Sequence, residues 1–185
     1  NRNLLCMSNF SPLFKKDYLV LHDVTFLDSE GKNNFFWSMA YKIFVSFRIK
    51  IHKKIFTVSE FSKERILFHY KKLNPNKIVV VYNGGDHLKN IHEEVPNFTV
   101  PSEFYLAVGS TTNNKNFDYI LALAKKNPDK KFEIVGRIDG NIKEKVSNLN
   151  NIHLTGYISN EMLDYLYKRT KAFILPSTYE GFGIP

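Results

Sequence analysis

Residues 173–185 read FILPSTYEGFGIP, and the rest of the sequence can be interpreted outward from this run. An apolar segment ends at Leu175, and a proline, two hydroxyls, an acid and two glycines follow it. In an open sheet of parallel strands, ligands bind beyond the carboxyl ends of the strands. Glycines at such an end let backbone N–H groups approach an anion, and Glu180 would lie in the same crevice. The run predicts a ligand-binding strand end or, as the simpler alternative, a helix-initiating loop with a solvated Glu180.

Short apolar runs also alternate with segments of helical periodicity along the rest of the chain. The apolar runs predict strands buried on both faces, as in a parallel sheet covered on both sides. Asn116 and Ser159 are predicted helix N-caps, because their side-chain oxygens can accept hydrogen bonds from the first N–H groups of a helix. Strict alternation of strand and helix predicts an α/β fold with right-handed crossovers. The predicted strands are residues 18–21, 55–58, 78–82, 104–108, 132–135, 152–154 and 172–175.

Residues 89–103 interrupt this alternation with two prolines, two adjacent acids and no periodicity. We interpret them as a linker between two domains. Residues 1–88 then form the later part of one Rossmann-like domain, and residues 104–185 the first part of another. The chain begins shortly before a strand and ends where a strand should lead into a helix, so we expect it to be truncated at both ends.

Composition limits the class of protein. With 43% hydrophobic and 24% charged residues among 185, the chain is globular rather than disordered. Its single cysteine, Cys6, excludes an internal disulfide framework and a four-cysteine zinc site, which favours a reducing, cytoplasmic compartment. No apolar stretch reaches the roughly 18 residues of a membrane-spanning helix. The net charge of +8 indicates an anionic partner, or simply many solvated lysines.

The run PSTYEGFGIP at residues 176–185 resembles the signature of family-4 (group 1) retaining glycosyltransferases, which have the GT-B fold. The resemblance implies that Glu180 contacts the donor sugar. It also implies that the backbone of Gly181, Phe182, Gly183 and Ile184 contacts the sugar and the diphosphate. A second glutamate of the family signature would lie three residues beyond Pro185. We therefore expect the 185-residue chain alone to be an inactive fragment.

Three other segments resemble landmarks of the same family, and one of them is Val135-Gly136 at the end of a predicted strand. Residues 108–116 resemble the first loop of its C-terminal domain, and the resemblance implies that Gly109 and Lys115 bind the donor diphosphate. The family usually has an arginine near this lysine, but Ser110 and Asn114 stand there. Residues 154–158 resemble the segment whose backbone contacts the nucleotide base, at Gly156, Tyr157 and Ile158. Without the resemblance, Lys115 would be interpreted as a surface lysine and the glycines as tight turns.

His22 follows the predicted strand at residues 18–21. Residues 57–62 and 81–86 lie at the ends of the predicted strands at 55–58 and 78–82. All three segments look like landmarks of the family's N-terminal domain. The resemblance places His22 near the donor sugar and the acceptor, where a neutral imidazole can give or take a hydrogen bond. A structural histidine at a strand end is the alternative.

Residues 35–50 form a strongly apolar segment that is rich in aromatic side chains, and His52, Lys53 and Lys54 follow it. A core helix that crosses the sheet is the favoured interpretation. The alternative is a helix that lies on an anionic membrane surface. Such contact at the inner face of the cytoplasmic membrane would suit an enzyme whose acceptor is a lipid-linked sugar.

The resemblance implies transfer of a sugar, with retention, from a nucleoside-diphosphate sugar to a hydroxyl of a glycan or lipid-linked glycan, in surface polysaccharide biosynthesis. It implies no cofactor and no metal, and the sequence shows no Asp-x-Asp metal motif. One alternative is an enzyme of this architecture with other chemistry, such as a nucleotide-sugar epimerase or a sugar phosphorylase. Another is a non-enzymatic basic module that binds membranes or nucleic acid. We expect no nucleic acid, because the basic residues are spread along the chain.

Overall fold

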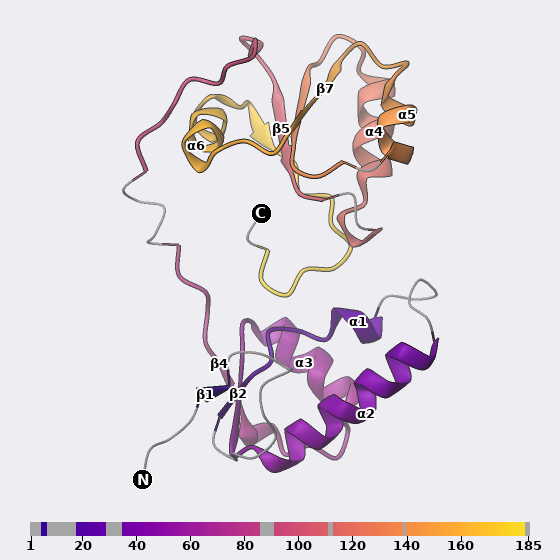
Figure 1. Ribbon diagram of the computed structural model, residues 1–185, viewed down its shortest axis with the longest axis vertical. Coiled ribbons are helices and arrows are strands. Elements are labelled where there is room, and N and C mark those ends of the chain that lie inside the picture. Colours follow the sequence, from indigo (N-terminus) through magenta and orange to yellow (C-terminus); the bar gives the residue numbers. More distant parts are fainter. Residues whose placement is uncertain are drawn as a thin grey trace. The chain divides into compact units, whose positions relative to one another are not determined.

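The computed structural model describes residues 5–6, 18–28, 35–85, 91–110, 113–138 and 140–183. They form two compact units, and Figure 1 colours their helices and strands along the sequence. The first unit contains the described residues up to Gly84 together with residues 180–183, and the second contains the described residues from Gly85 to Tyr179. Each unit is built on a parallel sheet, which confirms the predicted α/β class. That residues 89–103 connect two functional domains stays a prediction.

The first unit has the strand order β1-β2-β3-β4. The strands are in parallel register, with Leu19 opposite Ile55 and Ile55 opposite Ile78. These three side chains are buried, and Val45 and Ile49 of the longest helix pack on them. Its elements are β1 (Leu5–Cys6), β2 (Tyr18–Val20), α1 (Thr25–Asp28), α2 (Phe35–Ile51), β3 (Lys54–Thr57), α3 (Glu60–His69), η1 (Pro75–Lys77) and β4 (Ile78–Val80).

The second unit has the strand order β7-β6-β5-β8, again all parallel. Two buried clusters cover the two faces of this sheet. One contains Phe117 and Ile120 of α4, and the other contains Leu166 of α6. Its elements are β5 (Tyr105–Val108), η3 (Asn113–Lys115), α4 (Phe117–Lys126), β6 (Phe132–Val135), α5 (Gly140–Val146), β7 (Ile152–Gly156), α6 (Asn160–Arg169) and β8 (Ala172–Phe173).

The predicted burial of every strand on both faces was wrong in detail. Among the strands whose burial is described, only β6 is buried at each position, whereas Val79 and Val81 at the β4 end of its sheet are exposed. The buried run of β6 also contains a carboxylate. Glu133 is 1% exposed, and its Oε2 lies 2.7 Å from Nδ1 of His153 on β7. Burial raises the pKa of Glu133, and the paired imidazole opposes that rise.

One of the two predicted N-caps is confirmed. The hydroxyl of Ser159 accepts a hydrogen bond from the backbone N–H of Met162 at 3.1 Å. Asn116 does precede α4, but its backbone is left-handed (φ 49°) and its side chain makes no capping bond. The Asn116 amide instead donates to the carbonyl of Pro176, so a contact outside the helix competes with the local cap.

Helix α2 buries only one of its faces. Val45, Arg48 and Ile49 are buried, as expected for a core helix. Phe36 and Ile43 are 79% and 64% exposed, so apolar side chains also face outward among the described residues. The core interpretation therefore holds for the buried face, and contact with a membrane stays a prediction. No helix in the described part of the chain is both long enough and apolar enough to cross a membrane.

A charged cluster joins α1 to α3. Arg65 forms a two-pronged ion pair with the carboxylate of Asp28, and Nε2 of His69 lies 2.8 Å from Asp28 Oδ1. Burial pushes the pKa of Asp28 upward, but the hydrogen bonds from Arg65 and His69 outweigh it and hold this pKa below its usual 3.8. The charged carboxylate therefore stabilises the fold above pH 3.8, and this stability is lost as the pH falls through the lower, folded-state pKa.

We expect Asp28→Asn to lower the free energy of unfolding by about 1 to 2 kcal/mol near neutral pH, because it weakens two charge-assisted hydrogen bonds. The difference from the unchanged protein should shrink in acid. Urea unfolding at both pH values measures it. Glu60→Gln, at an exposed ion pair with Lys63 in the same unit, should have little effect. An equal loss at both pH values would show that the charge of Asp28 is not the cause.

Candidate functional site

Three glycines lie side by side at the carboxyl ends of three neighbouring strands in the second unit, and two of them, Gly109 and Gly156, are predicted to contact the donor. Gly109 follows β5 and donates its N–H to Val135. Gly136 follows β6 and donates to the carbonyl of Gly156 at the end of β7, at 2.8 Å. This edge is where open α/β sheets bind ligands. A Cβ on Gly136 would lie 2.2 Å from the carbonyl oxygen of Gly109, so a side chain at this position cannot fit without moving the backbone.

The loop that carries Lys115 is hydrogen-bonded to the run before Glu180. The carbonyl of Asn114 accepts a hydrogen bond from the backbone N–H of Thr178 at 2.8 Å, and a longer one from its hydroxyl at 3.4 Å. The Asn114 amide donates to the carbonyl of Tyr179, and the Asn116 amide donates to that of Pro176. Two segments that lie about 60 residues apart in sequence are thus held together by four hydrogen bonds.

Lys115 ends the short helix η3 and lies over the first of the three glycines. A Cβ built on Gly109 would be 3.5 to 3.8 Å from the carbons of the Lys115 side chain. The side chain is partly buried, and its loop is fixed by Asn114 and Asn116 on either side. The structure therefore brings the predicted diphosphate-binding residues Gly109 and Lys115 together beside residues 176–179.

The predicted base-binding segment continues the same edge of the sheet. Gly156 has φ +73°, a left-handed conformation that favours glycine, and it turns the chain out of β7. Tyr157 is 82% exposed, which leaves its ring open to stack on a planar ligand. Ile158 is different, because it is partly buried and packs against the cluster around Leu166. Its side chain therefore belongs to the core, and only its backbone remains a candidate for base contact.

In the first unit, His22 lies at the carboxyl ends of β2, β3 and β4. It is exposed and lines a cavity of about 380 Å³ together with Thr57 and Tyr82. Its backbone is fixed, because its carbonyl accepts a hydrogen bond of 3.0 Å from the hydroxyl of Thr57. Residues 57–58 and 81–83 also line this cavity, so the structure brings together the three strand-end segments predicted in this unit.

Residues 180–183 belong to the first unit and contact the same strand ends. The carbonyl of Gly181 accepts hydrogen bonds from the hydroxyls of Ser59 (2.5 Å) and Ser62 (3.1 Å) at the start of α3. A Cβ on Gly181 would lie 2.8 Å from a carboxylate oxygen of Asp23, which shows how closely the backbone approaches that residue. The ring of Phe182 lies 6.1 Å from that of Tyr82.

Glu180 itself is partly buried in this segment, and Gly183 has φ +84°. Ile184, the last predicted diphosphate-binding residue, lies outside the described residues. Glu180, Gly181, Phe182 and Gly183 thus belong to the first unit, and Lys115 belongs to the second.

Sequence reasoning missed several residues that build these sites. It noted Asn114 only because it stands where the family usually has an arginine, yet Asn114 and Asn116 tie the Lys115 loop to residues 176–179. It also missed Ser59 and Ser62, which hold the carbonyl of Gly181. Asparagines that follow a strand-end glycine were the available signal for the first pair, whereas nothing in the sequence links Ser59 to a residue 122 positions away.

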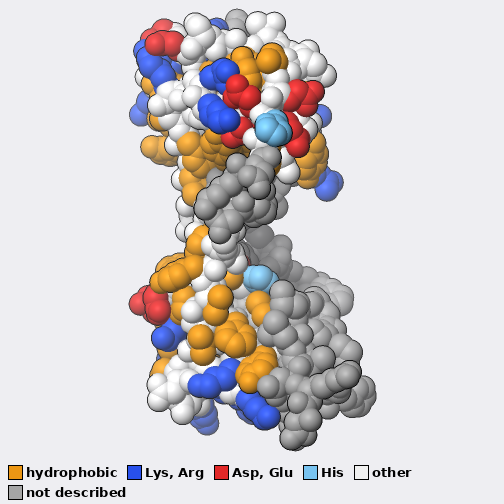
Figure 2. Space-filling model, turned by 90° about the vertical axis from the view of Figure 1, so that its left-hand side faces the viewer, with side chains coloured by type: hydrophobic (Ala, Val, Ile, Leu, Met, Phe, Trp, Pro, Cys, Tyr) orange, Lys and Arg blue, Asp and Glu red, His pale blue; other side chains and the backbone are white. Residues whose placement is uncertain are grey.

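Several charged side chains on the second unit form ion pairs. Arg169 makes two hydrogen bonds with Glu93, and Lys168 bonds Asp164 at 2.7 Å. Figure 2 shows Lys and Arg side chains lying next to Asp and Glu side chains on one face of this unit. A continuous basic stripe for nucleic acid is not visible on that face. Within the described ranges, no group of three His, Cys, Asp or Glu side chains could hold a metal ion.

Known proteins resemble this chain in sequence. It is 27% identical over 202 residues to the O-antigen chain mannosyltransferase RfbU of Salmonella typhimurium strain LT2. That alignment takes in 100% of this chain and 52% of RfbU, so the chain spans about half the length of this curated relative.

Solved structures resemble it in fold. HepE of Anabaena, in complex with UDP and glucose, superposes with a TM-score of 0.66 at 16% identity, over 91% of this chain and 48% of HepE. TarM of S. aureus superposes with a TM-score of 0.63 at 20% identity, over 91% of this chain and 33% of TarM. These likenesses confirm the predicted GT-B type of α/β fold.

The family comparison covers the second unit and the run that follows it. Residues 88–185 match the family described as Glycosyl transferases group 1. This range contains the strand-end glycines, Lys115 and Glu180, which are the residues on which the resemblance rested. The chain belongs to the group 1 glycosyl transferases.

Proposed function

We propose that the full-length protein transfers a sugar from a nucleoside-diphosphate sugar to a hydroxyl of a glycan or lipid-linked glycan, in the biosynthesis of a surface polysaccharide. The observation that carries this proposal is the set of four hydrogen bonds that holds the Lys115 loop against residues 176–179. The printed names of the relatives support the substrate classes, since RfbU is an O-antigen chain mannosyltransferase and HepE was solved with UDP and glucose.

The proposed reaction follows from the chemistry of the named side chains. The ammonium of Lys115 and the N–H groups at the strand ends stabilise the diphosphate as it leaves with its bonding electron pair. Glu180 accepts a hydrogen bond from a hydroxyl of the donor sugar. The acceptor hydroxyl attacks the anomeric carbon on the face that the diphosphate leaves and passes its proton to the departing diphosphate oxygen, so the configuration is retained. We propose that this transfer needs neither a metal ion nor a cofactor.

The family assignment favours this function over the epimerase and basic-module alternatives.

We propose a cytoplasmic protein that contacts the inner face of the cytoplasmic membrane through α2. The exposed side chains of Phe36, Met39, Ile43 and Phe47 recur at helical spacing on α2, with Lys42 and Lys50 beside them. Apolar side chains flanked by lysines suit the boundary between acyl chains and anionic headgroups.

Replacing Lys115 by alanine in the full-length protein should weaken nucleoside-diphosphate binding by about 1.5 to 3 kcal/mol, the range for hydrogen bonds to charged groups. Isothermal titration calorimetry with UDP and GDP, in the presence of EDTA, measures the loss. Lys125→Ala removes an exposed lysine from the end of α4 in the same unit and should leave the affinity unchanged. Equal affinities for the Lys115→Ala variant and the unchanged protein would remove Lys115 from the donor site.

A further inference from the structure

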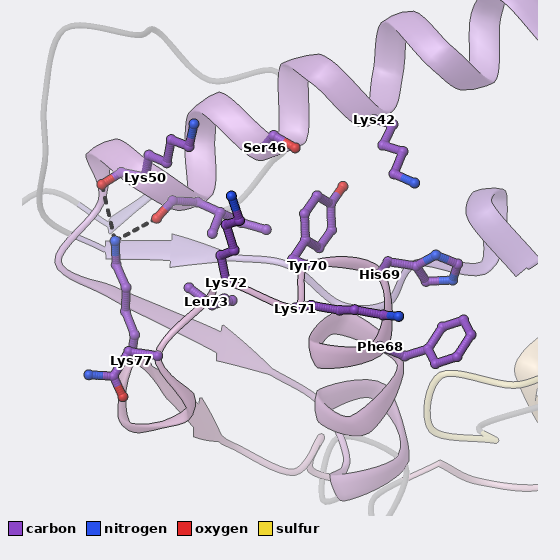
Figure 3. Close-up of a pocket in the computed structure, with 12 residues that line it drawn as sticks. Lys42, Ser46, Lys50, Phe68, His69, Tyr70, Lys71, Lys72, Leu73 and Lys77 are labelled. Atoms are coloured by element: carbon purple, nitrogen blue, oxygen red, sulfur yellow. Dashed lines mark hydrogen bonds between the residues drawn. The ribbon is translucent and has the colours of Figure 1, made fainter.

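One cavity of the first unit lies outside the proposed transfer site. Its volume is about 820 Å³, and it opens between the second half of α2 and residues 68–77 (Figure 3). Such a volume is within the range of small-molecule sites. The lining residues are Lys42, Ser46, Ile49, Lys50, Phe68, His69, Tyr70, Lys71, Lys72, Leu73, Asn74 and Lys77.

The topology places this cavity at the edge of the sheet opposite His22. Residues 49–50 end α2 just before β3 begins, and residues 70–77 come just before β4 begins. The cavity therefore lies at the amino ends of these strands. The His22 cavity is lined by residues 57–58 and 81–83, which follow the carboxyl ends of the same strands. A ligand in the larger cavity would be separate from the donor and acceptor.

Five lysines and no carboxylate are among the residues that line this cavity. Lys77 is fixed, because its Nζ donates to the carbonyls of Ile49 (2.5 Å) and Lys50 (3.1 Å) at the end of α2. The other four are Lys42, Lys50, Lys71 and Lys72, which are exposed and form no ion pair with any described residue. In Figure 3, Lys42 extends from α2 toward the 70–74 loop, and Lys72 extends from that loop toward α2.

Asp28, whose carboxylate contacts a residue that lines the cavity, does not neutralise these lysines. Asp28 contacts the lining residue His69, but its carboxylate is already engaged by Arg65 and His69. Gathering several ammonium groups without counter-charges creates a positive potential. A multiply charged anion relieves this mutual repulsion better than a single carboxylate does.

The floor of the cavity is apolar and carries one buried hydroxyl. Ile49, Phe68 and Leu73 line it together with the ring of Tyr70. The hydroxyl of Tyr70 is buried, and it has no hydrogen-bond partner among the described residues. The nearby Ser46 slightly opposes the rise in the pKa of Tyr70 that burial causes. Burial raises the pKa of Tyr70, so its hydroxyl keeps its proton and can donate to an anion. A cavity with lysine ammonium groups and apolar side chains is suited to bind a phosphate that is attached to an apolar group.

We propose that this cavity binds the phosphate or pyrophosphate group of an amphiphilic ligand. Ammonium groups on flexible stems bind phosphate oxygens by charge-assisted hydrogen bonds, and Lys42, Lys71 and Lys72 supply them from two sides of the cavity. The apolar part of the ligand packs on Ile49 and Leu73. The phosphate comes either from a lipid headgroup or from a free phosphorylated molecule, and the two sources can be separated experimentally.

The test is site-resolved acylation of lysines by an N-hydroxysuccinimide ester, read by mass spectrometry on the purified protein. Inorganic pyrophosphate, phosphatidylglycerol vesicles and phosphatidylcholine vesicles are added in separate arms. Protection of Lys71 and Lys72 by pyrophosphate identifies a site for free phosphate. Protection by phosphatidylglycerol vesicles alone identifies a site for a lipid headgroup. Lys125 and Lys126, an exposed pair in the second unit, should react equally in every arm.

The Lys71→Ala/Lys72→Ala variant should bind the protecting ligand about tenfold more weakly or worse, as expected when charge-assisted bonds are lost. The Lys125→Ala/Lys126→Ala variant has the same change in net charge and should bind normally. Circular dichroism checks that both variants are folded. The proposal is overturned if neither pyrophosphate nor phosphatidylglycerol protects Lys71 and Lys72, or if both double variants lose binding equally. Acylation of Lys115 is read in the same spectra, so loss of the donor site would be recognised separately.

Discussion

Replacing Gly136 by alanine should lower the free energy of unfolding by about 3 to 5 kcal/mol, because the added methyl group meets backbone atoms. The Cβ of the alanine would be 2.2 Å from the carbonyl oxygen of Gly109 and 2.9 Å from its carbonyl carbon. Both atoms belong to the backbone, so no flexible side chain can move aside. Gly136 also has φ +124°, which is strained for any residue with a Cβ.

The damage should reach the donor site as well. Gly136 donates its N–H to the carbonyl of Gly156, and the N–H of Gly109 donates to Val135. Pushing Gly136 away from Gly109 therefore disturbs the carboxyl ends of three adjacent strands. We expect weaker nucleoside-diphosphate binding in addition to lower stability.

Thermal unfolding measures the loss of stability, and the midpoint temperature of Gly136→Ala should be lower by about 10 °C or more. Gly140→Ala is the matched control, because nothing lies within 4 Å of a Cβ at that position in α5. Alanine is the better helix former, so this control should be neutral or slightly stabilising. A midpoint for Gly136→Ala equal to that of the control would mean that the strand ends tolerate a side chain, contrary to the close contact described here.

The elements of the fold were predictable because each strand leaves a local signal in the sequence. Short, mainly apolar runs such as residues 132–135 are typical of buried strands, and β6 has those bounds. The exposure of Val79 and Val81 was not predictable. An apolar run in the sequence does not show whether its strand lies at the edge or in the middle of a sheet. Glu133 was also missed, because its partner His153 comes from another strand, and periodicity along one strand cannot show that pairing.

The candidate site was predictable to a different degree. Glycines at strand ends and Lys115 were found through the family resemblance, and the parallel sheet brings the successive strand ends together. The roles of Asn114 and Asn116 were not, because side chains of this type usually bond their own neighbours in sequence. Here their side chains donate to carbonyls about 60 residues away in sequence, and such contacts depend on the tertiary fold. Resemblance therefore located the ligand-binding residues, and only the structure showed what holds them.

Glu180→Gln in the full-length protein should lower kcat by about 10² to 10³, comparable to the loss of one preorganised electrostatic partner. The carboxylate of Glu180 is proposed to accept a hydrogen bond from the donor sugar. It also places negative charge near the anomeric carbon, where positive charge develops as the diphosphate leaves. Both effects are stronger in the transition state than in the ground state, so the change should appear in kcat more than in KM.

A purely structural role for Glu180 predicts a different result. If Glu180 only caps a following helix, glutamine should cost roughly 1 kcal/mol of stability and leave turnover nearly unchanged. Steady-state kinetics and the thermal midpoint, measured on one preparation, separate the two roles. Glu161→Gln makes the same chemical change at an exposed residue in the first turn of α6 and should leave kcat intact. The backbone of Glu180 is followed by Gly181, whose carbonyl is held by Ser59 and Ser62, so the substitution should leave the segment in place. A lower midpoint with normal kcat would make Glu180 structural, whereas a normal midpoint with low kcat would assign its charge to the transfer step.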